Sequence, residues 1–132
     1  MIFLKDQCIF CNKTNCKIIK LSKYFFIIRD TAYPVTQHHT LIITNRHIED
    51  FFDLTDSEIV NLNKIMKEQK KELLKLDKTI TGFNVGVNIG KDAGQSIKHC
   101  HIHLIPRRKG DVGDPQGGVR GVIPSKQKYK RK

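Results

Sequence analysis

The pattern of apolar and polar positions divides the chain into short strand-like runs and one long run with helical spacing. Tyr24 to Asp30 and His39 to Thr44 are rich in aromatic and β-branched residues, and Tyr33-Pro34 between them favours a turn, so a hairpin is predicted there. Further along, Phe83 to Asn88 and Ser96 to Ile105 alternate between apolar and polar residues. The alternation predicts two more strands.

A long helix is predicted between these two pairs of strands. Thr55-Asp56-Ser57-Glu58 has the composition of a capping box, in which the Thr55 hydroxyl accepts a hydrogen bond from the Glu58 amide. Behind it, apolar residues recur at steps of three and four and predict one core face: Ile59, Leu62, Ile65, Met66, Leu73 and Leu76. Lysines interspersed with glutamates fill the remaining arc, which we expect to be solvated. Strands, one helix and strands again indicate an α+β domain on an antiparallel sheet.

Both ends of the chain lack such periodicity. Cys8 to Lys20 is polar and turn-rich, which predicts a knuckle or a short helix. The segment from Pro106 to Pro124 contains five glycines, which predicts an extended arm rather than a packed element.

Length and composition set limits on the class of protein. A chain of 132 residues predicts one domain. The longest apolar run, Tyr24 to Ile28, is far shorter than the ~20 residues of a membrane-spanning helix. Ile2 to Leu4 is too short for the core of a signal peptide, so we expect a cytoplasmic protein with no membrane partner. In that compartment the four cysteines stay reduced, which favours metal or redox roles over disulfides.

The formal net charge of +11 favours anionic partners without distinguishing nucleotides from RNA or acidic membranes. Part of it lies in residues 126–132, which hold five lysines and arginines and no acid. We therefore divide the chain into a domain at 1–125 and a basic C-terminal tail at 126–132.

Candidate chemistry is concentrated in His99-Cys100-His101-Ile102-His103. In a strand, the three histidines lie on one face, while Cys100 and Ile102 lie on the core face. Alternate residues of a strand are ~6.5 Å apart, so three such ligands do not easily converge on one metal ion. The other possibility is a nucleophilic site, in which a neutral central imidazole attacks and its neighbours donate hydrogen bonds to an anionic substrate.

Phosphate, if it is the substrate, has to be bound without a glycine-rich loop, because neither GxxxxGK[ST] nor GxGxxG occurs in the chain. Gly94-Gln95-Ser96 supplies amide and hydroxyl donors just before the histidines, and Arg107 follows them.

Residues 94–107, which read GQSIKHCHIHLIPR, resemble the signature of the histidine-triad (HIT) family of nucleotide hydrolases and transferases. The Arg108-Lys109-Gly110-Asp111 stretch is similar to the branch that contains the fragile-histidine-triad dinucleoside polyphosphate hydrolases and bacterial relatives. The resemblance extends from Cys8 to about Pro124. It implies an α+β domain with a five-stranded antiparallel sheet, one long and one short helix, and pairing as a homodimer.

The resemblance also implies roles for individual residues. His101 matches the histidine that attacks the α-phosphorus and becomes a nucleotidyl-histidine, which water then hydrolyses. Gln95, Ser96 and His103 match positions that contact the phosphates and the leaving group. The positions implied to bind substrate are Asp30, His39, Asn88 and Arg107, with His38 as the alternative to His39.

Cys8-Ile9-Phe10-Cys11 is a single CxxC pair, a weak signal for zinc and for redox chemistry alike. Relatives with this pair bind structural zinc through it and two histidines, which match His47 and His99. The alternatives are an empty reduced pair and a redox pair. No organic cofactor is expected.

We therefore expect a nucleotide hydrolase that cleaves diadenosine tri- or tetraphosphate or a nucleoside phosphoramidate. A nucleotide- or RNA-binding module with vestigial activity is the alternative from another class, although we do not expect nucleic acid to be a partner. A zinc-stabilised interaction protein is a third.

Overall fold

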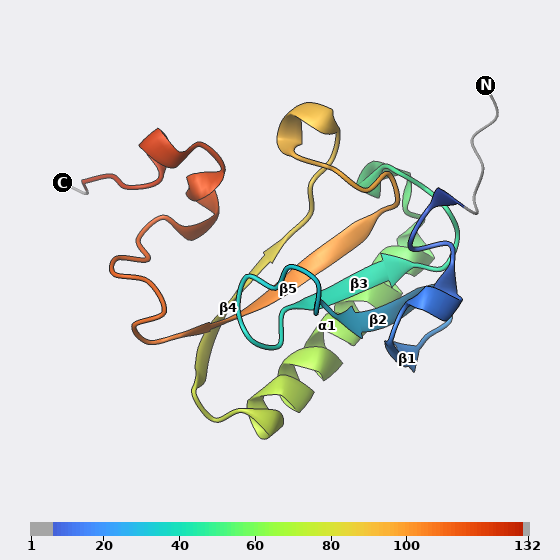
Figure 1. Cartoon of the computed structure of the whole chain (residues 1–132), viewed down its shortest axis with the longest axis horizontal. Helices are drawn as coiled ribbons and strands as arrows, with labels where there is room; N and C mark the ends of the chain where they lie inside the picture. The colour runs from blue at the N-terminus through green and yellow to red at the C-terminus, as the bar shows by residue number, and fades with distance from the viewer. Residues whose placement is uncertain (1–6, 131–132) are drawn as a thin grey trace.

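A computed structural model describes residues 7–130, in which five antiparallel strands form one sheet with the order β1-β2-β3-β5-β4 (Figure 1). The strands are β1 (Ile18–Leu21), β2 (Phe25–Arg29), β3 (Thr40–Thr44), β4 (Ile80–Gly86) and β5 (His101–Arg108). The predicted hairpin is confirmed, because β2 pairs with β3 through residues 30–39. β5 lies between β3 and β4, so the histidines of β5 occupy the middle of the sheet.

One face of the sheet is covered by α1 (Asp56–Leu76). The predicted capping box starts this helix: the Thr55 side chain accepts from the Glu58 amide, and the Glu58 side chain accepts from the Thr55 amide. Leu62 and Ile65 pack on the sheet with Cys100 and Ile102 of the β5 segment. This core confirms the predicted inward face of β5.

The opposite face is partly covered by the segment that precedes β1. Cys8 and Phe10 are buried there against Phe26, Leu41 and Ile43. Where a knuckle or short helix was expected, the chain forms a 3-10 turn, η2 (Lys13–Asn15), and α1 is the one α-helix of residues 7–130. The turn-rich sequence favours this tighter geometry.

The boundaries of two strands differ from the prediction. The β5 strand begins at His101 instead of Ser96, because the preceding residues bond to other segments; the Cys100 amide, for example, donates to the Ile48 carbonyl. The β4 strand begins at Ile80 and ends at Gly86, so Asn88 lies beyond it.

The predicted core face of α1 was wrong at both ends of the helix. Ile59 in the first turn is 39% exposed and Leu76, the last residue, is 63% exposed. The stripe of buried residues runs instead through Glu58, Leu62, Ile65, Gln69 and Leu73, and Ile59 and Leu76 lie beside it.

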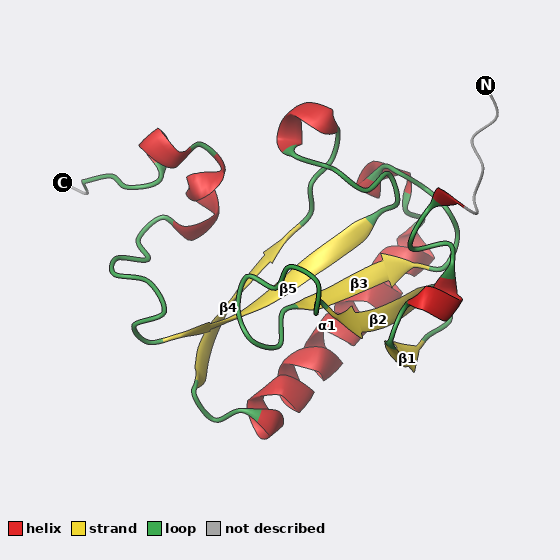
Figure 2. Ribbon diagram, in the orientation of Figure 1, coloured by secondary structure: helices red, strands yellow, loops and turns green. Residues whose placement is uncertain are grey.

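The C-terminal arm, residues 109–130, is not simply extended. It contains two 3-10 helices, η5 (Gly118–Val122) and η6 (Pro124–Lys126), which lie together away from α1 (Figure 2). The Arg120 guanidinium holds them together by donating to the carbonyls of Lys126 and Gln127. The proposed domain boundary at residue 125 therefore falls inside η6.

Two sequence features, Ile2 to Leu4 and the last two residues of the tail, lie outside the described residues. Within residues 7–130, no helix has the length and apolarity needed to cross a membrane.

Candidate functional site

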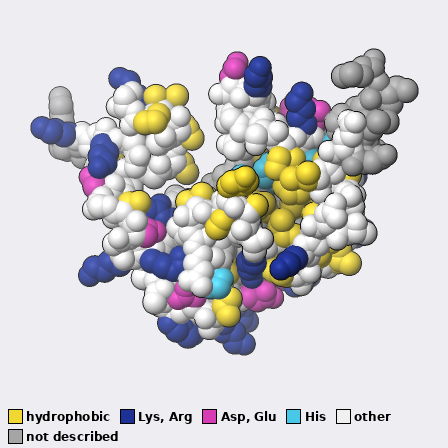
Figure 3. All heavy atoms as spheres, in the orientation of Figure 1, with side chains coloured by type: hydrophobic (Ala, Val, Ile, Leu, Met, Phe, Trp, Pro, Cys, Tyr) yellow, Lys and Arg dark blue, Asp and Glu magenta, His cyan; other side chains and the backbone are white. Residues whose placement is uncertain are grey.

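The candidate site lies on the face of the sheet opposite α1, where histidines of β5 stand beside the start of β3. His101 pairs with Ile43 and His103 with Leu41 in the β3–β5 register. The two imidazole rings are 5.2 Å apart between centroids. Histidine side chains reach the surface next to a patch of hydrophobic side chains on the face shown in Figure 3.

The tautomer of His101 is set by one backbone group. Its Nδ1 lies 2.8 Å from the His99 carbonyl oxygen, which only accepts hydrogen bonds, so Nδ1 carries the proton. Its Nε2 therefore keeps a free lone pair. No described residue bonds to that nitrogen, and residues 7–130 contain no buried side-chain nitrogen or oxygen without a partner, so Nε2 is open to solvent.

His39 and His103 form a second chain of hydrogen bonds. The Val35 amide donates to His39 Nδ1 at 3.0 Å, so a neutral His39 carries its proton on Nε2. That Nε2 lies 2.9 Å from His103 Nδ1 and donates to it. His103 must then carry its own proton on Nε2, for which no acceptor lies within the described residues. The accessible Nε2–H donor of His103 thus lies beside the accessible, unprotonated Nε2 of His101.

Burial keeps these imidazoles neutral. Desolvation lowers the pKa values of His39 and His101 below the ordinary histidine value, and it lowers the pKa of His103 to about 4. The Asp30 carboxylate lies 3.9 Å from His39 Nδ1 and partly opposes the effect in all three. The neutral forms are the ones that the two hydrogen-bond chains require.

A second group of side chains lies next to this pair. Cys8, Cys11, His47 and His99 bring one ligand atom each within 4.8 Å of one another. His99 Nδ1 is 3.4 Å from Cys8 Sγ, 3.5 Å from Cys11 Sγ and 3.2 Å from His47 Nδ1. Zinc binds such ligands at ~2.0–2.3 Å, and a tetrahedral ion then separates the donor atoms by ~3.3–3.8 Å. The observed distances fit that geometry.

The tautomer of His99 agrees with a role as a ligand. Its Nε2 lies 2.8 Å from the Thr44 carbonyl oxygen and must donate to it, which leaves the Nδ1 lone pair directed at the two sulfurs. Burial lowers the pKa of His99 to about 4, which also favours the unprotonated ligand. These four residues can therefore hold a metal, which would fasten the first residues of the domain to β3 and β5.

Phe10 separates the two groups, and sequence reasoning missed it. Its ring meets His101 edge-on at 5.2 Å and His99 at 5.8 Å between centroids. Phe10 lies between the two cysteines of the CxxC pair, and an aromatic residue at that position was the signal that the sequence offered.

A cavity of about 500 Å³ opens beside Phe10, and we refer to it as the Phe10 cavity. Ile28, Leu41 and Ile97 supply apolar wall. Asp30 lies on its edge, so the cavity reaches the carboxylate nearest to His39.

Of the remaining predicted site residues, Gln95 and Ser96 lie in the loop before β5. The Gln95 side chain bonds to the backbone of that loop and to the Glu49 carbonyl. Ser96 lines a smaller cavity of about 320 Å³ together with Cys8. The structure therefore places both residues in the loop that leads to His101, with the Gln95 amide already engaged by backbone groups.

The other two predicted residues lie at opposite ends of the site. Asn88 follows β4, whose last residue, Gly86, is paired with His103. Arg107 lies farther along β5, where its guanidinium binds Asp111 at 2.7 and 2.9 Å and Asn84 at 2.6 Å. Of the two adjacent loop histidines, it is His39 that is buried and contacts His103.

The fold and the site define a small α+β domain with a histidine pair at the centre of its sheet and a Cys2His2 group next to the end of β3 and the start of β5. Residues 12–110 match the model of the HIT domain. The chain belongs to the HIT family.

Curated relatives agree with this assignment. An uncharacterised HIT-like protein of Methanocaldococcus jannaschii is 34% identical over 109 residues, which are 80% of this chain and 82% of that protein. The nitrilase and fragile histidine triad fusion protein NitFhit of Caenorhabditis elegans is 41% identical over 81 residues, 61% of this chain but 18% of that protein. The asymmetrical bis(5'-nucleosyl)-tetraphosphatase of Schizosaccharomyces pombe is 33% identical over 95 residues, 72% of this chain and 50% of that enzyme. The chain thus spans about half or less of these two longer proteins.

Two solved structures share the fold. A zinc-bound histidine triad family protein from Mycobacterium smegmatis has a TM-score of 0.72 and 28% identity, with 82% of this chain and 80% of that chain covered. Diadenosine triphosphate hydrolase of Plasmodium falciparum has a TM-score of 0.67 and 28% identity, with 74% and 65% covered.

Proposed function

We propose that this protein hydrolyses a dinucleoside polyphosphate, such as diadenosine tri- or tetraphosphate, through a nucleotide covalently bound to His101. The observation that carries the proposal is the orientation of His101, whose Nδ1 is held by the His99 carbonyl while Nε2 is unprotonated and accessible. Relatives that act on dinucleoside polyphosphates, by their names, support the substrate class.

In the first step, the His101 Nε2 lone pair attacks the α-phosphorus of the bound nucleotide. A P–N bond forms, and the P–O bond to the rest of the polyphosphate breaks, so the bonding electrons leave with that oxygen. The His103 Nε2–H donates a hydrogen bond to this oxygen as negative charge develops there. The imidazolium of His101 stays bonded through Nδ1–H to the His99 carbonyl, which favours the positive charge.

In the second step, water attacks the phosphorus and the P–N bond breaks. Its electrons return to His101 Nε2, a proton from the water is released, and a nucleoside monophosphate leaves. The first step needs no external base, because the attacking imidazole is already neutral at pH 7.

The Phe10 cavity would hold the nucleoside whose phosphate is attacked. Its volume lies within the ~300–1,000 Å³ of small-molecule sites, and its apolar walls suit a nucleobase. The Asp30 carboxylate would accept hydrogen bonds from the ribose hydroxyls. Gln95, Ser96 and Asn88 are the proposed phosphate contacts from the two loops that flank His101 and His103.

A nucleoside phosphoramidate is the second candidate substrate. The observation that favours it is the same His103 Nε2–H, which can donate a hydrogen bond to the leaving nitrogen while that nitrogen takes its proton from water.

We also propose that the Cys2His2 group holds one zinc ion with a structural role. The ion would supply coordination bonds that fix Cys8 and Cys11 beside His47 and His99. Since His99 is engaged there, catalysis falls to His101 and His103.

Intact-protein mass spectrometry after brief mixing with diadenosine tetraphosphate and an alkaline quench tests the proposal, because acid would cleave the P–N bond of the adduct. The expected result is an adduct with the mass of an adenylyl group, AMP minus water, on wild-type protein and none on His101→Ala. A nucleotide-binding module with vestigial activity would bind the compound without forming the adduct, and that result would refute the hydrolase mechanism.

A further inference from the structure

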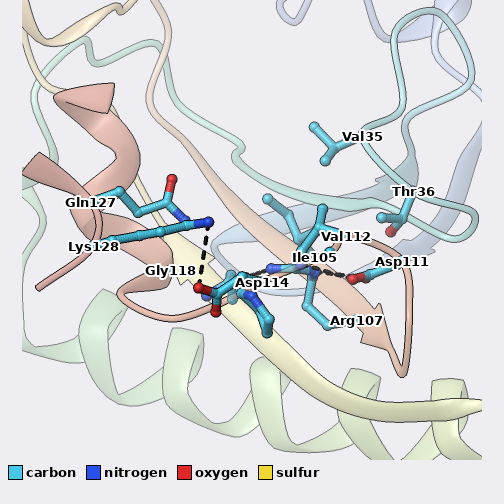
Figure 4. Close-up of a pocket in the computed structure, with 13 residues that line it drawn as sticks. Val35, Thr36, Ile105, Arg107, Asp111, Val112, Asp114, Gly118, Gln127 and Lys128 are labelled. Atoms are coloured by element: carbon cyan, nitrogen blue, oxygen red, sulfur yellow. Dashed lines mark hydrogen bonds and ion pairs between the residues drawn. The ribbon is translucent and has the colours of Figure 1, made fainter. Parts of the chain in front are cut away.

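A second cavity of about 530 Å³ lies on the same face of the sheet, between β5 and the C-terminal arm (Figure 4). We call it the arm cavity. Val35 and Thr36 of the 30–39 loop stand on one side of it, Gln127 and Lys128 on the other, and Ile105 lies between them (Figure 4).

The arm cavity begins where the histidine pair ends. Ile105 is the next residue after His103 on this face of β5, only ~6.6 Å farther along the strand. Val35 lines the cavity, and its amide donates to His39, which in turn bonds to His103. The Phe10 cavity borders the pair from the other direction, through the ring contact of Phe10 with His101.

Two cavities of nearly equal volume thus flank one pair of histidines within a single chain. Each volume lies in the ~300–1,000 Å³ range of small-molecule sites. A substrate with two nucleosides joined by a phosphate chain has the matching arrangement, with a compact group at each end and the reacting phosphorus between them.

The lining of the arm cavity suits a nucleoside better than a bare polyphosphate. Val35, Ile105 and Val112 supply apolar wall, and the amides of Asn84 and Gln127 supply donors and acceptors. The Arg107 charge is largely taken up by Asp111.

Lys128, unlike Arg107, carries a charge that is only weakly paired within the cavity. Its ammonium is 3.4 Å from the Asp114 carboxylate, and both side chains are more than half exposed. An exposed ion pair of this kind contributes little, so Lys128 can exchange its partner for a phosphate at small cost.

We propose that the arm cavity binds the nucleoside of the leaving group, so that residues of the C-terminal arm select dinucleoside over mononucleotide substrates. This inference rests on the proposed function. It adds a binding site formed by Val112, Gln127 and Lys128 together with the end of β5.

The test compares two substrates that give the same His101 adduct. Diadenosine tetraphosphate carries a nucleoside in its leaving group, whereas the p-nitrophenyl ester of AMP does not. Gly113→Trp adds bulk to the wall of the cavity, since Gly113 lines it and leaves open space where a Cβ would stand. Lys128→Glu reverses the one exchangeable positive charge.

Matched controls come from the same arm. Val122→Trp adds the same bulk at a residue that is 78% exposed and lines neither cavity. Lys130→Glu makes the same charge change two residues from Lys128, again outside the cavity lining.

Both cavity variants are expected to lower kcat/KM for diadenosine tetraphosphate about tenfold, mainly through KM, because only the leaving nucleoside loses its site. The ester should stay within about twofold of wild type in every variant, and the controls should stay there with both substrates. If Gly113→Trp does not fold, Lys128→Glu decides alone.

Equal losses on both substrates, no loss on either, or a similar loss in the controls overturns the arm cavity as a nucleoside site. These outcomes leave the proposed function standing as long as the wild type cleaves both compounds. A wild type that cleaves neither compound overturns the proposed function itself, and the arm cavity then loses its assignment with it.

Discussion

His101 depends on one carbonyl oxygen for its chemistry. The His99 carbonyl fixes the proton on Nδ1 and leaves Nε2 as the nucleophile, so removing the imidazole removes the proposed reacting atom. We expect His101→Ala to abolish turnover of diadenosine tetraphosphate while the protein still folds and binds the nucleotide, with the lower melting temperature that loss of a buried side chain brings. His38→Ala is the matched control, because His38 is a half-buried loop residue whose carbonyl accepts a hydrogen bond from the Thr40 hydroxyl and which does not contact the pair.

Steady-state rates check this prediction. Residual activity above about a tenth of wild type, equivalent to ~1.4 kcal/mol of barrier, would exclude His101 as the nucleophile.

His103 gives the protein a pH-dependent stability. Its pKa in the folded state is lowered to about 4, against ~6.5 for an unperturbed histidine, because burial disfavours the charged form. Between about pH 6.5 and about pH 4, the His103 side chain is therefore protonated in the unfolded chain and neutral in the folded chain. The free energy of unfolding should be level above this window and fall within it as the pH decreases, by at most ~1.4 kcal/mol per pH unit for this residue.

Urea unfolding of wild type and His103→Asn between about pH 7.5 and pH 4.5 measures the effect. The variant should have the shallower slope. Loss of a bound metal at low pH would affect both proteins alike, so the difference between the slopes isolates His103. Identical slopes would contradict a buried neutral imidazole at this position.

The segment that precedes β1 supplies two of the four residues of the Cys2His2 group, Cys8 and Cys11. Residues 8–16 are short and polar, and apart from Cys8 and Phe10 they contribute few buried side chains. We expect about one zinc ion per chain, and we expect Cys8→Ser with Cys11→Ser to lose both the ion and several kcal/mol of stability. Cys16→Ser is the control, because Cys16 lies outside the group.

Elemental analysis and denaturant unfolding check the zinc prediction together. Protein purified without chelator that contains no metal and is as stable as the loaded form would leave the cysteine pair without this role.

The start of α1 combines its capping box with a charge pair. Glu58 is buried, and the Arg46 guanidinium that bonds to it lowers the pKa of its carboxyl group. Thr55→Ala should cost about 1 kcal/mol of stability by removing the acceptor for the Glu58 amide. Ser57→Ala, one position before Glu58 on the exposed side, should cost less than half of that, and equal losses in the two variants would count against the cap.

Elements of this fold differ in how far a sequence predicts them. The two faces of β5 can be predicted from the alternation of side chains along a strand, because the apolar residues Cys100 and Ile102 alternate with the histidines. The residue at which that strand begins cannot be predicted in this way, since the Cys100 amide bonds to the Ile48 carbonyl of a distant loop. The helix start is predictable because its capping box is local, whereas the exposure of Ile59 depends on which side of the helix faces the sheet, and Glu58 is the buried residue of that turn.

The candidate site shows the same division between local and distant causes. Strand alternation and family resemblance predict which histidines lie close together. The tautomers of these histidines cannot be predicted, because they depend on backbone groups of His99, Thr44 and Val35 whose positions only the fold determines. The arm cavity is also invisible in the sequence, since glycine-rich segments carry no periodic signal.

At the scale of the whole molecule, β4 remains an open edge of the sheet. It pairs with β5 on one side, and Val85 near its end is 47% exposed. A seven-residue edge strand with an exposed apolar side chain favours pairing with another strand. We therefore propose that two chains join as a homodimer with two equivalent sites, and that their sheets continue through this edge.

Sedimentation equilibrium at micromolar concentration tests the assembly. A dimer of 15.2 kDa chains is expected to have a mass of about 30 kDa, and Val85→Lys should shift the mass toward the monomer because it places a charge on the paired edge. Deleting the basic tail, residues 126–132, should leave the protein a dimer, since the described part of the tail, residues 126–130, lies in the arm and not on β4. A wild-type mass near 15 kDa with full activity would show that each chain works alone, and a loss of the dimer on tail deletion would move the interface from β4 to the arm.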